Sequence, residues 1–131
     1  MAYTVNKTDG SVLTTVADST LDTTSDLTLI GKNYAGYGEI QNENFVYLLE
    51  NFANTTAPSS PIAGELWWDT GTSTLKVYTG TNWKGAGGLT RQATAPSSPS
   101  EGELWFDTTN DQLFAWDNTS WILVGPLYAA G

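Results

Sequence analysis

Cysteine and histidine are both absent from this chain of 131 residues. Without them the chain forms no disulfide, and the usual zinc sites and the Ser–His or Cys–His arrangements of nucleophilic enzymes are excluded. The absence of cysteine also fits folding in a reducing cytoplasm. We therefore expect no enzyme activity, no bound metal and no cofactor.

Paired carboxylates are the one catalytic option that remains. Glu65 and Asp69 fall on the same face of an expected strand, as do Glu103 and Asp107. Four residues of strand separate each pair by about 13 Å, whereas glycoside hydrolysis needs roughly 5–9.5 Å between its carboxyls. Within one strand this distance is too long, although pairing across chains stays open.

Basic residues are also scarce, with 5 Lys and Arg against 14 Asp and Glu and a net charge of −9. So few cations cannot neutralise a phosphate backbone or an anionic lipid surface, so we expect neither nucleic acid nor a membrane as partner. The N-terminus is polar and there is no long apolar run, so we also expect no signal peptide and no transmembrane segment.

What the chain does contain is a segment written twice. Residues 56–70 (TAPSSPIAGELWWDT) return as residues 94–108 (TAPSSPSEGELWFDT), each residue 38 positions after its counterpart. The same offset relates Trp83 to Trp121. A period of this size is typical of proteins built from tandem repeats.

Each copy has the signals of three short strands. Pro-Ser-Ser-Pro favours extended backbone, the aromatic run after Gly-Glu predicts a strand, and Thr, Gly, Asn and Ser clusters predict two turns. We therefore expect two tandem antiparallel β-meander modules, at residues 55–92 and 93–131, after an N-terminal attachment segment at residues 1–54. The glycine-rich residues 84–92 are expected to be a spacer that lets the modules rotate.

Both faces of the expected sheets carry large apolar groups. Side chains alternate across a strand, so Leu66 and Trp68 share one face while Trp67 and Asp69 share the other. A unit of 38 residues is too small to cover two such faces by itself. The neighbouring repeat, other copies of the chain, or both must therefore cover them, and we favour other copies.

The N-terminal segment predicts a hairpin and a helix. Asp9-Gly10 is a hairpin turn signal within residues 3–16, residues 17–26 are a polar connection, and residues 27–30 form a short strand. Tyr34 and Tyr37 either pack over a small core or contact a docking partner. The fold class is thus mainly β with one amphipathic helix.

That helix is predicted over residues 42–53, with Asn42 as its N-cap. Its apolar residues recur at helical spacing and form a stripe on one face. The stripe packs either on the chain's own hairpin, which we favour, or against two other helices on a symmetry axis. Together the helix and the repeats predict these assembly residues: Phe45, Leu48, Leu49, Phe52, Leu66, Trp67, Trp68, Tyr78, Trp83, Leu104, Trp105, Phe106, Phe114, Trp116 and Trp121.

The tandem motif Pro-x-x-Pro-x-x-Gly-Glu-Leu-Trp resembles the short repeats of tail-fibre proteins from tailed bacteriophages. Residues 3–10, 27–38 and 42–53 resemble the start of virion structural proteins from phages of cyanobacteria. The resemblance implies an elongated fibre, an intertwined homotrimer assembled in the host cytoplasm, whose residues 1–54 dock on other virion proteins. It leaves open whether the site is the tail, baseplate, neck or capsid. The apolar residues 124–131 predict that the fibre continues beyond them.

Carbohydrate binding is the alternative function, in a small module that grips host surface glycans. Aromatic rings stack on sugars, and small glycan-binding modules use rows of them. The residues that would do so are Trp67, Tyr78, Trp83, Trp105, Trp116 and Trp121. The competing interpretation is that the tryptophans fill a core or an interface between chains.

Overall fold

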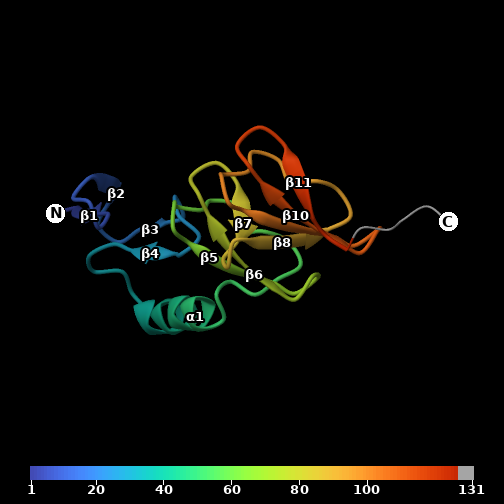
Figure 1. Cartoon of the computed structure of the whole chain (residues 1–131). Coiled ribbons are helices and arrows are strands. Elements are labelled where there is room, and N and C mark those ends of the chain that lie inside the picture. Colours follow the sequence, from blue (N-terminus) through green and yellow to red (C-terminus); the bar gives the residue numbers. More distant parts are fainter. Residues whose placement is uncertain (127–131) are drawn as a thin grey trace. The chain divides into compact units, whose positions relative to one another are not determined.

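The computed structural model describes residues 1–126, which form several small, mostly antiparallel sheets and one helix (Figure 1). The chain divides into two compact units, Met1–Asn82 and Trp83–Gly131. In the described part of the chain no helix has both the length and the apolar content needed to cross a bilayer. Most of the apolar chain end, from which we predicted a longer fibre, lies outside the described residues.

The N-terminal hairpin is confirmed. Strands β1 (Tyr3–Asn6) and β2 (Val12–Val16) pair antiparallel, with Tyr3 opposite Val16. Gly10 occupies the left-handed region with φ 88°, and the N–H of Ser11 donates to Asp9 Oδ1 at 2.9 Å. The Asp-Gly pair therefore closes the hairpin, as its turn chemistry predicts.

A second, shorter ladder follows, of which only the strand within residues 27–30 was predicted. Strands β3 (Leu21–Asp22) and β4 (Leu29–Ile30) pair antiparallel, so the expected polar connection contains a strand. A Cβ on Gly31 would lie 2.1 Å from the carbonyl oxygen of Ala17, so only glycine fits this approach. A strand of two residues is too short to produce a periodic pattern, so the sequence did not predict β3.

Helix α1 (Tyr37–Leu49) starts and ends earlier than predicted. Gly36, in the left-handed conformation with φ 75°, precedes it without a side-chain cap, so the prediction of an Asn42 cap is wrong. Asn51 and Phe52 both have left-handed φ, at 52° and 53°, and end the helix. Backbone turns rather than a polar cap therefore set both ends.

In the first repeat, β5 (Leu66–Asp69) and β6 (Thr74–Tyr78) pair antiparallel with Trp68 opposite Leu75. Asn54 adds a parallel bridge to Asp69 on the other side of β5. The pairing of this repeat therefore begins before residue 55, where we had placed the module boundary.

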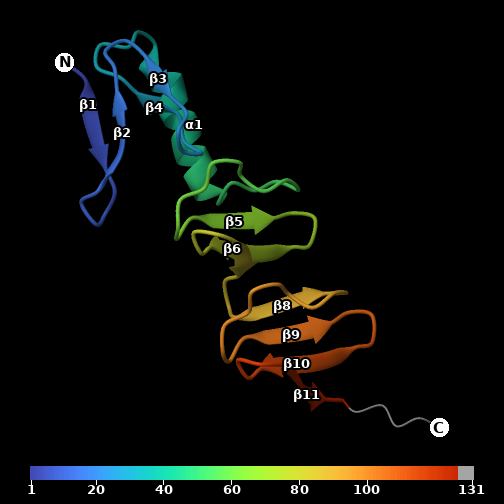
Figure 2. The ribbon, with the colours of Figure 1, turned by 90° about the horizontal axis from the view of Figure 1, so that it is seen from above.

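The second unit opens with β7 (Trp83–Gly85) and β8 (Leu89–Gln92). Strands β9 (Leu104–Asp107), β10 (Gln112–Trp116) and β11 (Trp121–Gly125) follow, and the sheet order is β11-β10-β9-β8 (Figure 2). Strand β8 runs parallel to β9, and β10 is antiparallel to both its neighbours. The prediction of a glycine-rich spacer at residues 84–92 is therefore wrong for most of that range, because only residues 86–88 lie outside strands.

Each of the two repeats has a parallel partner of this kind. Gln92 pairs with Asp107 as Asn54 bridges to Asp69, again 38 residues apart. The chain divides into its two compact units after Asn82, whereas we predicted boundaries after residues 54 and 92. In each repeat, residues that precede the repeated motif pair with its first strand. The repeated motif does not contain these residues, so it did not predict this pairing.

Candidate assembly interface

The strand face that carries Trp67 and Asp69 is sheltered within the chain. Each of these two residues is only 6% exposed, while Leu66 and Trp68 alternate with them on the open side. The predicted alternation is therefore confirmed. The expectation that a single chain can cover neither face is wrong for this one.

Both buried tryptophans bind the segment that runs beside their strand. The indole N–H of Trp67 donates to the carbonyl of Asn54 at 3.2 Å, and that of Trp105 donates to the carbonyl of Gln92 at 3.0 Å. Trp105 is 8% exposed. A buried indole N–H needs such a partner, so the ring holds the parallel segment in place.

Asp69 beside Trp67 is also satisfied. Its carboxylate accepts hydrogen bonds from the N–H of Gly71 at 2.9 Å and from Lys76 Nζ at 3.0 Å. Burial raises the pKa of Asp69, but the hydrogen bonds, of which that from Lys76 is the strongest, outweigh it and hold the pKa below its ordinary value. The same Lys76 ammonium lies 4.9 Å from the ring centroid of Trp67.

Asp107 repeats this role with different neighbours. The side chain of Asn110 takes the place of the lysine and donates to Asp107 Oδ2 at 2.9 Å, and the N–H of Thr109 donates to Oδ1 at 2.9 Å. These bonds, led by that from Asn110, lower the pKa of Asp107. The repeat therefore keeps a buried carboxylate whose task is to close the turn after the strand.

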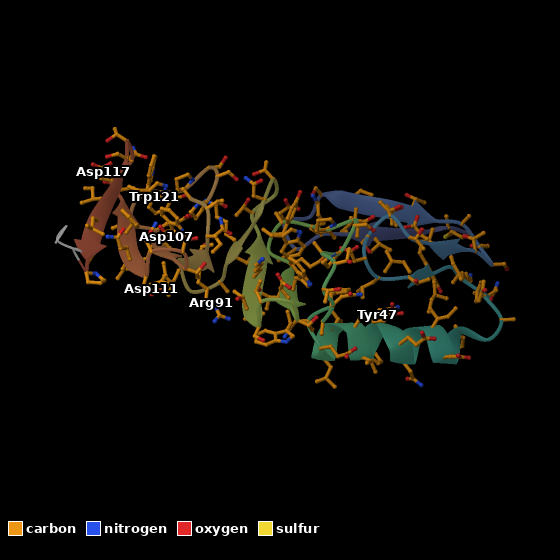
Figure 3. The ribbon with its side chains drawn as sticks, turned by 90° about the vertical axis from the view of Figure 1, so that its right-hand side faces the viewer. Tyr47, Arg91, Asp107, Asp111, Asp117 and Trp121 are labelled. Atoms are coloured by element: carbon orange, nitrogen blue, oxygen red, sulfur yellow. The ribbon has the colours of Figure 1, made fainter. Side chains whose placement is uncertain are left out.

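Aromatic rings cover the sheltered face in the second unit. Trp105 stacks on Phe114 with centroids 4.9 Å apart and meets the edge of Trp121 at 5.6 Å. Trp116 lies 5.2 Å from Trp121. Figure 3 shows Trp121 on the same sheet as Asp107. Four predicted assembly residues therefore form one cluster within a single chain.

The opposite face of the repeat strands is open. Leu66 is 39% exposed and Trp68 is 38% exposed, and the corresponding Leu104 is 36% exposed. Phe106 is half-buried. We name Leu66, Trp68, Leu104 and Phe106 the open strand face. Of the predicted assembly residues in the repeats, Tyr78 and Trp83 are also half-buried.

Helix α1 has no buried residue, and its apolar stripe is open. Phe45 is 58%, Leu48 51% and Leu49 82% exposed. The favoured prediction, that the stripe packs on the chain's own hairpin, is therefore wrong. Phe52 lies beyond the end of the helix, where its ring stacks on Tyr47 at 6.3 Å.

A polar contact explains the orientation of the helix. The side chain of Asn44 accepts from the backbone N–H of Thr28 at 3.0 Å and donates to its carbonyl at 2.7 Å. This amide satisfies both backbone groups, as a neighbouring strand would. Asn44 therefore faces the chain, and the positions that the periodicity marked as inward face away. Tyr37, at the first turn, is 56% exposed.

The sequence did not predict the contacts that the two repeat glutamates make. Lys84 Nζ lies 2.7 Å from Glu103 Oε1, with both side chains 19% exposed. Glu65 lies instead against the carboxyl of Asp26, which also accepts the backbone N–H of Ser60. Residues 19 and 39 positions apart make these contacts, and no local pattern connects such positions.

Two of the six aromatic residues expected to stack on sugars are covered within the chain. Trp67 and Trp105 are buried and hydrogen-bonded, so neither offers a ring face to a sugar. Trp83, Trp116, Trp121 and Tyr78 remain half-buried. Within residues 1–126 no three His, Cys, Asp or Glu side chains are grouped to hold a metal ion.

Comparisons with protein-family models, with curated proteins and with solved structures found no match for this chain.

Proposed function

We propose that this chain is a structural component of a phage virion, a fibre or fibre-attachment protein that acts by self-assembly and docking. Three copies associate through the helix stripe (Phe45, Leu48 and Leu49) and the open strand face. Residues 1–54 dock on other virion proteins. The observation that carries the proposal is that helix α1 has no buried residue although its stripe is apolar.

The size of the stripe fits an interface between chains. Fully burying an exposed Leu or Phe side chain contributes about 1.5–3 kcal/mol. The three stripe residues are 51–82% exposed in the single chain, so burying what remains of them contributes roughly 3–6 kcal/mol per chain. Association costs about 4–15 kcal/mol in lost freedom of motion. The stripe alone is therefore marginal, and the open strand face is the surface that can supply the rest.

Association also protects the chain from uncontrolled contacts. Exposed strand edges with apolar side chains favour aggregation, and Ile122 and Val124 on β11 are 50% and 61% exposed. A closed symmetric assembly buries such surfaces in a defined number of copies. That number, three, comes from the resemblance of the tandem motif to tail-fibre repeats. With only 5 basic residues the chain is poorly suited to nucleic acid or anionic lipid.

Sedimentation velocity and native mass of the full chain test the assembly. We expect three times 14.1 kDa for the wild type, and a shift toward the monomer for Leu49→Lys. Leu49 is so exposed in the single chain that its loss leaves the monomer fold intact. Asn42→Lys is the matched control, because it adds the same charge at an exposed position of the same helix.

A wild type that stays monomeric at every concentration would refute self-assembly. A saturable change in tryptophan fluorescence with cell-wall glycans would then favour the carbohydrate module. The place in the virion is tested separately, by detecting the chain in purified particles. Its absence from them would refute the virion part of the proposal.

A further inference from the structure

Glu65 and Glu103 occupy the same position of the two repeats but face opposite charges. The N–H of Glu65 donates to the carbonyl of Ile62 at 2.9 Å, and that of Glu103 donates to the carbonyl of Ser100 at 3.0 Å. The backbone turn is therefore the same in both. The side chain of Glu103 pairs with the ammonium of Lys84, whereas that of Glu65 meets a second carboxyl, Asp26.

Each carboxyl of the Asp26–Glu65 pair is half satisfied. Asp26 Oδ1 accepts the N–H of Ser60 at 2.8 Å, and Glu65 Oε1 accepts the N–H of Ile62 at 3.3 Å. Asp26 Oδ2 and Glu65 Oε2 are buried and have no donor. Two ionised carboxylates cannot donate to each other, so a hydrogen bond between Asp26 and Glu65 would require one proton. A single proton shared between these two oxygens would satisfy both at once.

Within the described part of the chain, no Lys or Arg forms an ion pair with Asp26 or Glu65. The groove beside Asp26 contains Tyr47 and Glu50, and Glu50 adds no positive charge. Lys7 and Tyr78 line the groove beside Ser60 and Ile62, where Lys7 makes no ion pair with either carboxyl. A second negative charge at this place would therefore be unbalanced.

We propose that Asp26 and Glu65 form a proton-dependent latch, in which one shared proton fastens the N-terminal segment to the first repeat and its loss opens that joint. Asp26 belongs to the segment before helix α1, and Ser60, Ile62 and Glu65 belong to the repeat. The latch lies within one compact unit of one chain. It therefore operates whether or not the chain self-assembles.

The direction of the pH effect follows from the proton. Burial, and then the neighbouring Asp26, raise the pKa of Glu65 from 4.5 to about 8. Between these values the fastened state holds a proton that the opened state has released. Opening therefore becomes easier by up to about tenfold per pH unit as the pH rises, and it levels off above pH 8. In acid the latch is at full strength.

The first test is the titration of the Glu65 side-chain carboxyl by NMR in the full wild-type chain. We expect a midpoint near pH 8. A midpoint close to 4.5 would overturn the proposal, because both carboxyls would then be ionised at neutral pH. A midpoint that falls when calcium is added would also overturn it, since a metal ion would then replace the proton.

The second test measures hydrogen-exchange protection of the Ser60 and Ile62 amides from pH 5 to 9, after correction for intrinsic exchange. In the wild type the protection falls as the pH rises. In Glu65→Gln, whose side-chain amide donates to Asp26 as the proton did, the protection is independent of pH. Glu103→Gln, which removes the Lys84 ion pair at the same repeat position, keeps the wild-type slope. Equal slopes in the wild type and Glu65→Gln would refute the latch.

Discussion

Replacing Trp67 and Trp68 one at a time by phenylalanine separates the covered face of a repeat from its open face. The two residues are adjacent on β5, and the chemical change is the same. Trp67 is 6% exposed and Trp68 is 38% exposed. The pair is therefore its own control for loss of an indole.

The cost of Trp67→Phe has two main parts. The indole N–H bond to Asn54, 3.2 Å long, contributes about 1 kcal/mol. The smaller ring loses roughly another 1 kcal/mol of apolar burial. The carbonyl of Asn54 also accepts the N–H of Thr70 at 3.1 Å, so no unpaired acceptor adds a penalty. We expect about 2 kcal/mol of destabilisation, at any protein concentration.

Trp68→Phe should behave differently. In the single chain its cost is under about 0.5 kcal/mol, as for most exposed positions. If the open strand face is buried between copies, the cost grows as the protein concentration rises, because association stabilises the folded state by mass action. Urea unfolding followed by far-ultraviolet circular dichroism at several concentrations measures both variants. Equal costs for Trp67→Phe and Trp68→Phe at the lowest protein concentration would refute the assignment of the two faces.

Two further predictions concern the first unit. Gly31→Ala should destabilise it by about 3 kcal/mol in thermal or urea unfolding, because a Cβ there meets Ala17 O at 2.1 Å. The control Gly38→Ala, in open space on helix α1, should stabilise it by about 0.5–1 kcal/mol. Equal effects of the two substitutions would contradict the close approach at Gly31. Asp69 has a lowered pKa, so its ionised form stabilises the fold above its ordinary pKa of 3.8, and this stabilisation disappears as the pH falls through the lowered value. Asp69→Asn should therefore be less stable than the wild type at pH 7 and approach it in strong acid; a difference that persists at low pH would contradict the role of the charge.

The local parts of the fold could be read from the sequence. Turn chemistry located the N-terminal hairpin, and alternation assigned Trp67 and Trp68 to opposite faces of β5. Even the turn positions repeat, since Ser73 and Asp111 both adopt left-handed φ at 52° and 53°. These features depend on residues within a few positions of each other, so the order of residues contains them.

The packing of helix α1 could not be predicted from the sequence. Periodicity found an apolar stripe with Phe45, Leu48 and Leu49, but it could not say what the stripe meets. The contact of Asn44 with the backbone of Thr28 decided that this stripe faces away from the chain. One pair of hydrogen bonds thus overrode the expected packing, and only the folded chain brings those groups together.

The sequence by itself determined the duplicated unit, its strands and which side chains share a face, because each follows from short-range order. Tertiary structure alone decided the parallel partners of the two repeats, the covered and open faces, and the neighbour of each repeat glutamate. Glu65 and Glu103 occupy equivalent positions, yet one meets Asp26 and the other Lys84. Electrostatic environment depends on which distant residue folding brings alongside, and a repeated motif does not record that.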